Sequence, residues 1–221
     1  MRVLVIAPHP DDEVLGVGGV IARMSREGHE VQVVVITTGQ PPLFSEQFVL
    51  QVRKEAAEAH RLLGVMETSF LDGFPAAGLD GVPSHRLNEA LTRVLTEKQP
   101  ELLFVPFAGD IHLDHRITFT SALVAARPIH EHKVEAIYAY ETLSETNWFA
   151  PPVTPGFLPN TFFDITEVLD TKLEALKIFK SQMKSFPNER SLEAVEALAK
   201  FRGATVGFAA AEAFVLLRHR R

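Results

Sequence analysis

Short apolar runs alternate with stretches of helical periodicity through the first 140 residues, and this alternation constrains the fold more than any other feature. The runs are Val3–Ala7, Val31–Thr37, Thr68–Leu71, Leu102–Phe107 and Val134–Tyr140. Helical patterns separate them, at about Glu13–Glu27, Val49–Leu63, Leu87–Leu95 and His115–Arg127. This alternation favours a mostly parallel sheet with helices on both faces. Right-handed crossovers then place the carboxyl ends of the strands at one edge, where such sheets bind ligands.

The chain beyond residue 140 follows a different pattern. Glu141–Asn160 is expected to be a loop with four prolines, and a loop of this length in a compact domain is often functional. It precedes a predicted strand (Thr161–Ile165), a helix carrying Leu169, Leu173, Leu176 and Met183, a second helix near Ser191–Phe201, and a final apolar run at Ala213–Leu217. Since no flexible linker intervenes, we expect one α/β domain over 1–221, with a core of 1–140 and a C-terminal α+β elaboration over 141–221.

Composition excludes several classes of protein. The 221 residues are 46% hydrophobic and 23% charged, which is typical of globular proteins and unlike disordered ones. A net charge of −6 does not favour nucleic-acid binding. The apolar runs are too short for a membrane span or a signal peptide. With no cysteine the chain fits a cytoplasmic protein, and any metal must be bound by His, Asp or Glu.

Two clusters of ionisable residues follow predicted strands. His9-Pro10-Asp11-Asp12-Glu13 comes after the first, and His112-Leu113-Asp114-His115 comes after the fourth, preceded by Gly109-Asp110. Alone, each has an ordinary explanation, because acids favour a helix start and a histidine can cap a helix. At one sheet edge they should converge on the same crevice. Catalytic zinc takes three His or carboxylate ligands and keeps one position for water, so the pair of clusters indicates a metal site.

The two motifs together resemble those of the LmbE-like, or PIG-L, de-N-acetylases. These are zinc-dependent amidases that act on N-acetylglucosamine-containing molecules and have a Rossmann-like fold. Further matching stretches are Arg53-Lys54-Glu55 through Leu63-Gly64-Val65, Pro159-Asn160 with Asp164-Ile165-Thr166, Lys172 with Ser181-Gln182, and Arg202-Gly203 with Ala211-Glu212-Ala213-Phe214. The resemblance therefore covers nearly the whole chain. It implies a Rossmann-like sheet and one Zn²⁺ per chain, with other divalent metals as alternatives.

The resemblance also implies roles for the first motif and for His115. His9, Asp12 and His115 would bind the zinc, and Asp11 would be the general base. Elementary chemistry agrees, since zinc activates water and polarises an amide carbonyl, and a nearby carboxylate can accept the proton of that water. Because Asp11 and Asp12 are adjacent, their side chains should diverge, which suits one base and one ligand.

Three more residues receive roles from the resemblance. His112 would stabilise the oxyanion or protonate the leaving amine, and Asp114 would orient His112 and support its charge. Arg53, near Glu55 in sequence, would point into the crevice and bind substrate, and a surface salt bridge is the alternative. Many members of the family have an aspartate after the third strand, where this chain has Phe74-Pro75-Ala76-Ala77.

Other candidates are given structural roles. Gly16-Val17-Gly18-Gly19 follows an acidic turn and misses the dinucleotide fingerprint, so we interpret it as close helix–sheet packing. Asp110 is either an outer partner of the site or a turn former. His130 and His132 lie in a polar turn and are expected to be solvated rather than a second metal site. No role is assigned to the remaining histidines, His29, His60, His85 and His219.

We therefore expect a cytoplasmic zinc hydrolase that removes an acetyl group from an N-acetylated amino sugar or its conjugate. The alternatives are a metal-dependent amidase for a non-sugar N-acyl compound and a non-catalytic sugar- or nucleotide-binding module. A module would not need a base, an acid and three ligands together. The expected partner is a small amino-sugar substrate, and a homo-oligomer is compatible with the sequence. Three irregular segments that should contact the aglycone carry no recognisable pattern: Gln40–Gln47, Asp72–His85 and Glu141–Asn160.

Overall fold

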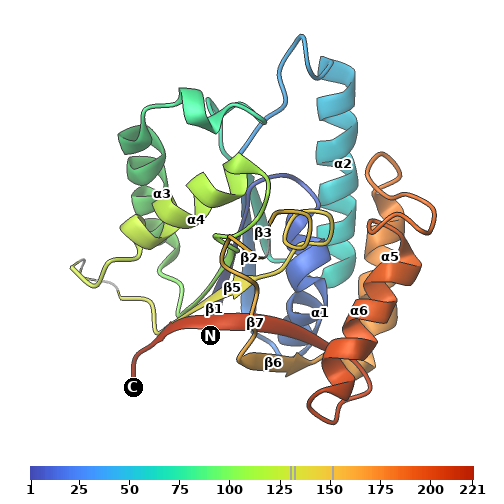
Figure 1. Cartoon of the computed structure of the whole chain (residues 1–221). Coiled ribbons are helices and arrows are strands. Elements are labelled where there is room, and N and C mark those ends of the chain that lie inside the picture. The colour runs from blue at the N-terminus through green and yellow to red at the C-terminus, as the bar shows by residue number, and fades with distance from the viewer. Residues whose placement is uncertain (130, 132, 151) are drawn as a thin grey trace.

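The computed structural model describes residues 1–129, 131, 133–150 and 152–221. Its centre is a sheet in the order β3-β2-β1-β4-β5-β7-β6 (Figure 1). The strands are β1 (Arg2–Ala7), β2 (Glu30–Val35), β3 (Glu67–Phe70), β4 (Leu102–Pro106), β5 (Ala136–Tyr140), β6 (Thr161–Asp164) and β7 (Ala211–His219). Strands β1 to β5 are parallel, whereas β7 is antiparallel to β5 and β6. The predicted mostly parallel α/β sheet is confirmed.

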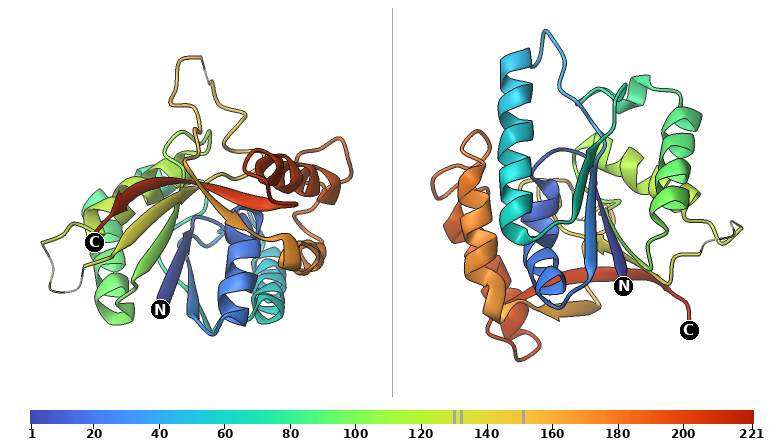
Figure 2. Two further views of the ribbon diagram at one scale, coloured as in Figure 1. Left: turned by 90° about the horizontal axis from the view of Figure 1, so that it is seen from below. Right: turned by 180° about the vertical axis from the view of Figure 1, so that it is seen from behind.

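Helices cover both faces of this sheet (Figure 2). One face carries α1 (Asp12–Arg26), α2 (Glu46–Leu63), α5 (Leu169–Ile178) and α6 (Leu192–Ala204); the other carries α3 (Ser84–Lys98) and α4 (Leu113–Ala125). Short 3₁₀ turns are η1 (Leu79–Gly81) and η2 (Thr166–Val168). Alternate residues of β1 divide between the two cores, Val5 on the α1 side and Ile6 on the α4 side. Both are fully buried, as expected of a strand covered on both faces.

Two helix boundaries differ from the sequence-based expectation. Helix α4 begins at Leu113 rather than His115, because Nδ1 of His112 accepts the backbone N–H of Asp114 at 3.1 Å and caps the helix. Helix α5 ends at Ile178, so the prediction that Met183 belongs to it is wrong. Phe179 leaves the helical region at φ −75° and ψ 61° while its side chain is fully buried. The chain then turns, and residues 181–190 return toward the carboxyl edge of the sheet.

The glycines of α1 allow this helix to pack closely, as interpreted from the sequence. A Cβ on Gly19 would lie 2.7 Å from Cγ2 of Ile165, which is closer than side chains approach. Gly16 lies against the ring of Tyr140 in the same way. Any larger residue at these positions would push α1 away from β5 and the C-terminal elaboration, and α1 carries the first motif at its N-terminus.

A buried ion pair holds the middle of α1. Nζ of Lys172 lies 2.6 Å from Oε1 of Glu212 and donates to the carbonyl oxygen of Leu15 at 2.7 Å. The Glu212 carboxylate accepts the backbone N–H groups of Gly19 and Val20 at 2.8 and 2.7 Å. The pair therefore connects α5 and β7 to the backbone of α1.

Among the described residues, no helix is long and apolar enough to cross a membrane.

Candidate active site

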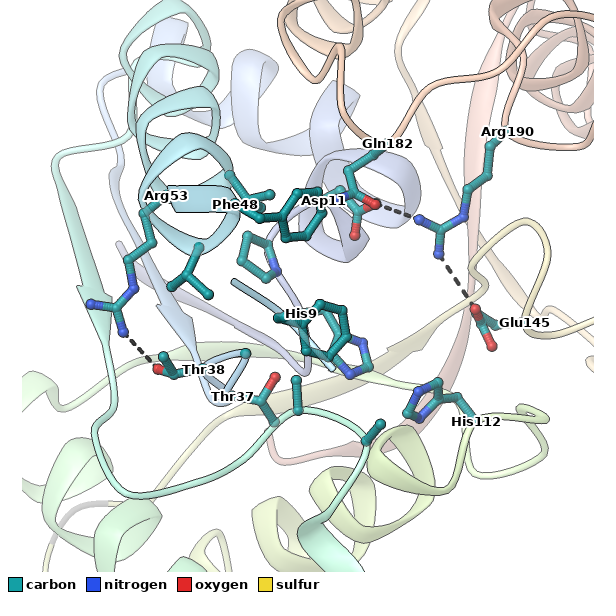
Figure 3. A pocket seen from close by; sticks show the side chains of 17 residues that line it. His9, Asp11, Thr37, Thr38, Phe48, Arg53, His112, Glu145, Gln182 and Arg190 are labelled. Atoms are coloured by element: carbon teal, nitrogen blue, oxygen red, sulfur yellow. Dashed lines mark hydrogen bonds and ion pairs between the residues drawn. The ribbon is translucent and has the colours of Figure 1, made fainter. Parts of the chain in front are cut away.

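The two motifs meet at the carboxyl ends of β1 and β4. These strands are neighbours, and the strand order reverses between them, which is where sheets of this kind bind ligands. His9 follows β1, His112 follows β4, and their ring centroids are 4.5 Å apart. The predicted convergence on one crevice is confirmed. Both histidines line a cavity of about 200 Å³, and Figure 3 shows them among its lining side chains.

Three of the predicted ligands form a compact group. Oδ2 of Asp12 lies 3.1 Å from Nδ1 of His9 and 3.1 Å from Nε2 of His115. Oδ1 of Asp12 and Nε2 of His115 are buried and lack a hydrogen-bond partner among the described residues. Buried polar atoms without partners are rare in proteins. Two imidazoles and a carboxylate that converge in this way, with two of their atoms left without a hydrogen bond, therefore fit a divalent metal.

A carboxylate contacts the second ring nitrogen of His115, and another contacts that of His9. Oδ2 of Asp110 lies 2.8 Å from Nδ1 of His115, and Oδ2 of Asp114 lies 3.1 Å from Nε2 of His9. Oδ1 of Asp110 accepts the hydroxyl of Thr146 at 2.6 Å. Metal-binding histidines commonly have such a carboxylate behind them, which fixes the ring and its tautomer. Asp110 is thus an outer partner of the site rather than a simple turn former.

The geometry around Asp114 differs from the role that the family resemblance implies. Its carboxylate lies 4.0 Å from Nδ1 of His112, beyond hydrogen-bonding distance. It instead contacts His9 and accepts the backbone N–H groups of Ala77 and Leu79 at 2.7 and 3.1 Å. His112 is oriented by the backbone N–H of Asp114, which occupies its Nδ1 and leaves Nε2 to carry the proton of the neutral ring.

A second grouping of possible ligands consists of His9, His112 and Asp114. Its Asp114 carboxylate is already bonded to two backbone N–H groups, and Nδ1 of His112 is bonded to a third. Neither buried unpaired atom described above belongs to this grouping. The structure therefore favours the group that contains Asp12 and His115.

Protons on His9 and His115 balance the negative charge of the carboxylates around them when no metal is bound. Burial alone would lower the pKa of His9, but hydrogen bonds to Asp114 and Asp12 outweigh it and raise that pKa to about 9. Burial also opposes protonation of His115, and the Asp12 and Asp110 carboxylates raise its pKa to about 10. Burial would raise the pKa of Asp12, but the two histidines hold that pKa well below its usual value. Two imidazolium ions therefore bring the charge that a divalent cation would supply.

Asp11, the predicted base, has a strained backbone with φ 135° and ψ −28°. Its N–H donates to Oε2 of Glu13 at 3.2 Å, and its carboxylate pairs with Nη1 of Arg190 at 2.5 Å. Burial raises the pKa of Asp11 to about 7, although Arg190 opposes this shift. Asp11 pairs with Arg190 (Figure 3), whereas the Asp12 carboxylate lies between His9 and His115, so the neighbouring carboxylates diverge as expected.

Two charged residues of the cavity were missed in the sequence, Glu145 from the loop after β5 and Arg190 from the segment before α6. Nη2 of Arg190 lies 3.4 Å from Oε1 of Glu145, and its Nε donates to Oγ of Ser144 at 2.8 Å. Both residues lie in irregular segments with no periodic spacing. Their contribution depends on long-range contacts, which leave no local signal.

His60 was given no role from the sequence, yet it is buried and supports the turn that carries Asp11 and Asp12. Its Nε2 lies 2.8 Å from Oε1 of Glu13, and its Nδ1 lies 2.8 Å from Oγ1 of Thr68. Glu13 in turn accepts the N–H of Asp11. Helical spacing places His60 on the buried face of α2, next to apolar residues. This position was the one sign in the sequence that His60 would be buried.

His130 and His132, expected to be solvated, lie outside the described residues.

Arg53 lines the cavity, with 30% of its side chain exposed. Its Nη2 donates to Oγ1 of Thr38 at 2.6 Å, and its guanidinium lies 4.8 Å from the ring centroid of Phe70. The alternative, a surface salt bridge, also has a counterpart in the structure, since Nη2 of Arg53 lies 3.8 Å from Oδ1 of the exposed Asp72, whereas the Glu55 carboxylate accepts the hydroxyl of Ser181. Substrate binding by Arg53 stays a prediction.

Comparisons with known proteins agree on one family. A family model described as PIG-L, GlcNAc-PI de-N-acetylase, matches residues 4–126. The probable N-acetyl-alpha-D-glucosaminyl L-malate deacetylase 2 of Bacillus anthracis is 26% identical over 190 residues, which cover 82% of this chain and 81% of that protein.

Two solved structures share the fold over almost the whole chain. The N,N'-diacetylchitobiose deacetylase of Pyrococcus horikoshii, solved with its inhibitor MPG, is 27% identical with a TM-score of 0.78, covering 98% of this chain and 83% of that one. A conserved protein of Thermus thermophilus is 29% identical with a TM-score of 0.81, covering 99% of this chain and 96% of that one.

Proposed function

Because the chain belongs to the PIG-L, or LmbE-like, family of de-N-acetylases, we propose that it is a zinc-dependent hydrolase that removes the acetyl group from an N-acetylglucosamine-containing small molecule. The observation that carries this proposal is the buried group of His9, Asp12 and His115 with Asp11 at its side, facing a cavity. Zinc-dependent amide hydrolysis needs ligands for the metal and a base for the attacking water. His9, Asp12 and His115 can serve as the ligands, and Asp11 can serve as the base. A cytoplasmic location stays a prediction.

A zinc ion held by His9, Asp12 and His115 would activate water and polarise the amide carbonyl. Asp11 accepts the proton of the attacking water, for which a pKa of about 7 is well suited near neutral pH. His112 is half-buried at the opposite side of the cavity, and its Nε2 is free to donate to the oxygen that becomes negative. Burial lowers the pKa of His112, which favours the neutral ring as that donor.

The departing amine also needs a proton. Asp11 holds one after the attack and lines the same cavity, so it can return that proton to the nitrogen, while the neutral His112 stays the donor to the oxyanion. The carboxylates of Asp110 and Asp114 do not face the substrate in this scheme. They hold the two histidine ligands from behind, so their effect is on metal affinity and ring orientation.

The proposal is tested by metal analysis together with acetate release. Purified protein should contain one zinc per chain and should release acetate from N-acetylglucosamine conjugates. His115→Ala should lose the zinc, since two protein ligands remain, whereas His85→Ala changes an exposed histidine and should retain it. Release of acyl groups only from non-sugar amides would favour the alternative amidase. Full zinc occupancy in His115→Ala would refute the ligand assignment.

A further inference from the structure

One wall of the catalytic cavity is apolar. Four side chains from the start of α2 and the loop before it form this surface, named here the α2 wall: Phe44, Phe48, Val49 and Val52. The Phe44 and Phe48 rings are stacked, with centroids 6.0 Å apart and an interplanar angle of 18°. Val52 is buried, whereas the other three are only partly buried. Figure 3 shows Phe48 pointing from α2 into the cavity that also contains His9.

The α2 wall continues the apolar stripe of a helix past the end of the sheet. Val52, Ala56, Ala59 and Leu63 repeat at helical spacing and are buried in the core. The N-terminal turns of α2 extend beyond the strand ends (Figure 1), so Phe48, one turn before Val52, faces the cavity instead of the sheet. Uncovered apolar surface of this kind is costly in water, and its usual reason is binding. The cavity is continuous with the metal centre, so the occupant must be part of the substrate.

Polar partners are scarce on this side of the cavity. Thr38 and Arg53 lie beside the α2 wall, where Nη2 of Arg53 donates to Oγ1 of Thr38 at 2.6 Å and lies 3.8 Å from Oδ1 of Asp72. The Arg53 guanidinium is also stacked over Phe70. A hydroxylated group placed against these four apolar side chains would lose hydrogen bonds to water without replacement from the wall itself. The described lining residues therefore favour an apolar group there.

We propose that the α2 wall binds an apolar aglycone, an aryl or medium-length alkyl group attached to the amino sugar. This inference rests on the proposed deacetylase function. The acetyl group is too small to cover two aromatic rings, and it must lie among His9, Asp11 and His112 to be cleaved. Sugar hydroxyls would find hydrogen-bonding partners in Glu145 and Gln182, which also line the cavity. The Pyrococcus and Bacillus relatives are named for chitobiose and L-malate, which are polar, so this chain would differ from them in substrate class.

The test compares β-N-acetylglucosaminides that differ only in the aglycone. The kcat/KM for the phenyl glycoside should exceed that for the methyl glycoside by roughly 10- to 100-fold, the factor expected when one ring leaves water. Phe48→Ala should reduce this ratio to below about threefold, because most of the ring contact is lost. Leu50→Ala is the matched control, since Leu50 is on the same helix but 70% exposed and does not line the cavity. It should leave the ratio unchanged.

A binding measurement separates this inference from the deacetylase proposal. Calorimetry with the deacetylated products, phenyl and methyl β-glucosaminide, should give the same preference and the same loss in Phe48→Ala. Phe44→Ala provides a second variant if Phe48→Ala does not fold. A phenyl-to-methyl ratio near one in the wild type would overturn the inference while leaving deacetylation intact. So would a preference for N-hexanoyl over N-acetyl groups that Phe48→Ala abolishes. Absence of all hydrolysis would refute the deacetylase proposal, and calorimetry would still decide the role of the wall.

Discussion

Nη1 of Arg190 lies 2.5 Å from Oδ2 of Asp11, although 179 positions separate the two residues in sequence. The guanidinium is itself held by Oγ of Ser144 and Oε1 of Glu145. Arg190, from the C-terminal part of the chain, thus fixes one carboxylate oxygen of Asp11, the predicted base. The strained backbone of Asp11 sets the direction in which its side chain leaves the main chain. The pairing gives the elaboration a direct part in arranging the catalytic turn.

Loss of this pairing should reduce turnover without removing the metal. Arg190→Gln should keep zinc and lower kcat by roughly 10- to 100-fold, less than complete loss of a positioned base. Arg190→Lys should recover part of that loss, since a lysine supplies the charge but not the planar donor pair. Arg202→Gln is the control, because Arg202 pairs with Glu141 away from the cavity. A change confined to KM would mean that Arg190 binds substrate rather than positioning Asp11.

The two adjacent aspartates should behave differently. Asp12→Ala should lose both metal and activity, because Asp12 is the proposed ligand that lies between His9 and His115. Asp11→Asn keeps the shape but cannot accept a proton, so zinc should stay while kcat falls by roughly 10²–10⁴. Zinc content and acetate release are measured on the same preparations. A metal-free Asp11→Asn with a zinc-loaded Asp12→Ala would reverse the assignment.

Replacement of Asp114 distinguishes its two candidate roles. Its carboxylate contacts His9 at 3.1 Å but lies 4.0 Å from His112. If it acts through His9, Asp114→Asn should weaken zinc binding by roughly 10- to 100-fold, as loss of an outer partner does in other metal sites. If it supports His112, as the family resemblance implies, zinc affinity should stay constant and only the rate should fall. Competition with a chromophoric chelator measures the affinity directly.

The sequence predicts the parts of this site that follow from local patterns. His9 and His112 directly follow apolar runs, and parallel-sheet topology then requires them to meet. Arg190 and Glu145 could not be found in this way, because they lie in irregular segments whose position depends on tertiary packing. The contact between Asp114 and His9 was also hidden, since the sequence places Asp114 two residues from His112 and 105 from His9. The support of His112 by Asp114 stays a prediction.

Zinc binding should release protons, and this follows from the raised pKa values of the ligands. His9 and His115, with pKa values of about 9 and 10, are protonated at pH 7 in the metal-free protein, but metal binds the neutral imidazole. Binding at pH 7 should therefore release close to two protons, fewer above pH 9 and almost none well above pH 10. Calorimetry in two buffers of different ionisation enthalpy measures this number. No dependence of the heat on the buffer would contradict the protonated, paired histidines.

The same shifts affect folding stability when the metal is removed. A pKa raised above the usual 6.5 stabilises the folded protein fully below that value, and the stabilisation is lost as pH rises through the folded-state pKa. Chelator-treated protein should therefore lose stability between about pH 7 and pH 10. Zinc-loaded protein should lose less over this range, because metal replaces the protons. Thermal unfolding at several pH values, with and without chelator, gives the comparison.

The buried pair behind α1 provides a prediction about stability alone. Lys172→Met leaves the Glu212 carboxylate buried without its cation and frees the carbonyl of Leu15, so it should lower the free energy of unfolding by about 3–5 kcal/mol. Lys177→Met is the matched control on the same helix, since Lys177 and its partner Glu174 are both exposed. It should change stability by less than about 1 kcal/mol. Urea denaturation of both variants decides the matter, and equal effects would mean that the buried pair contributes no more than a surface one.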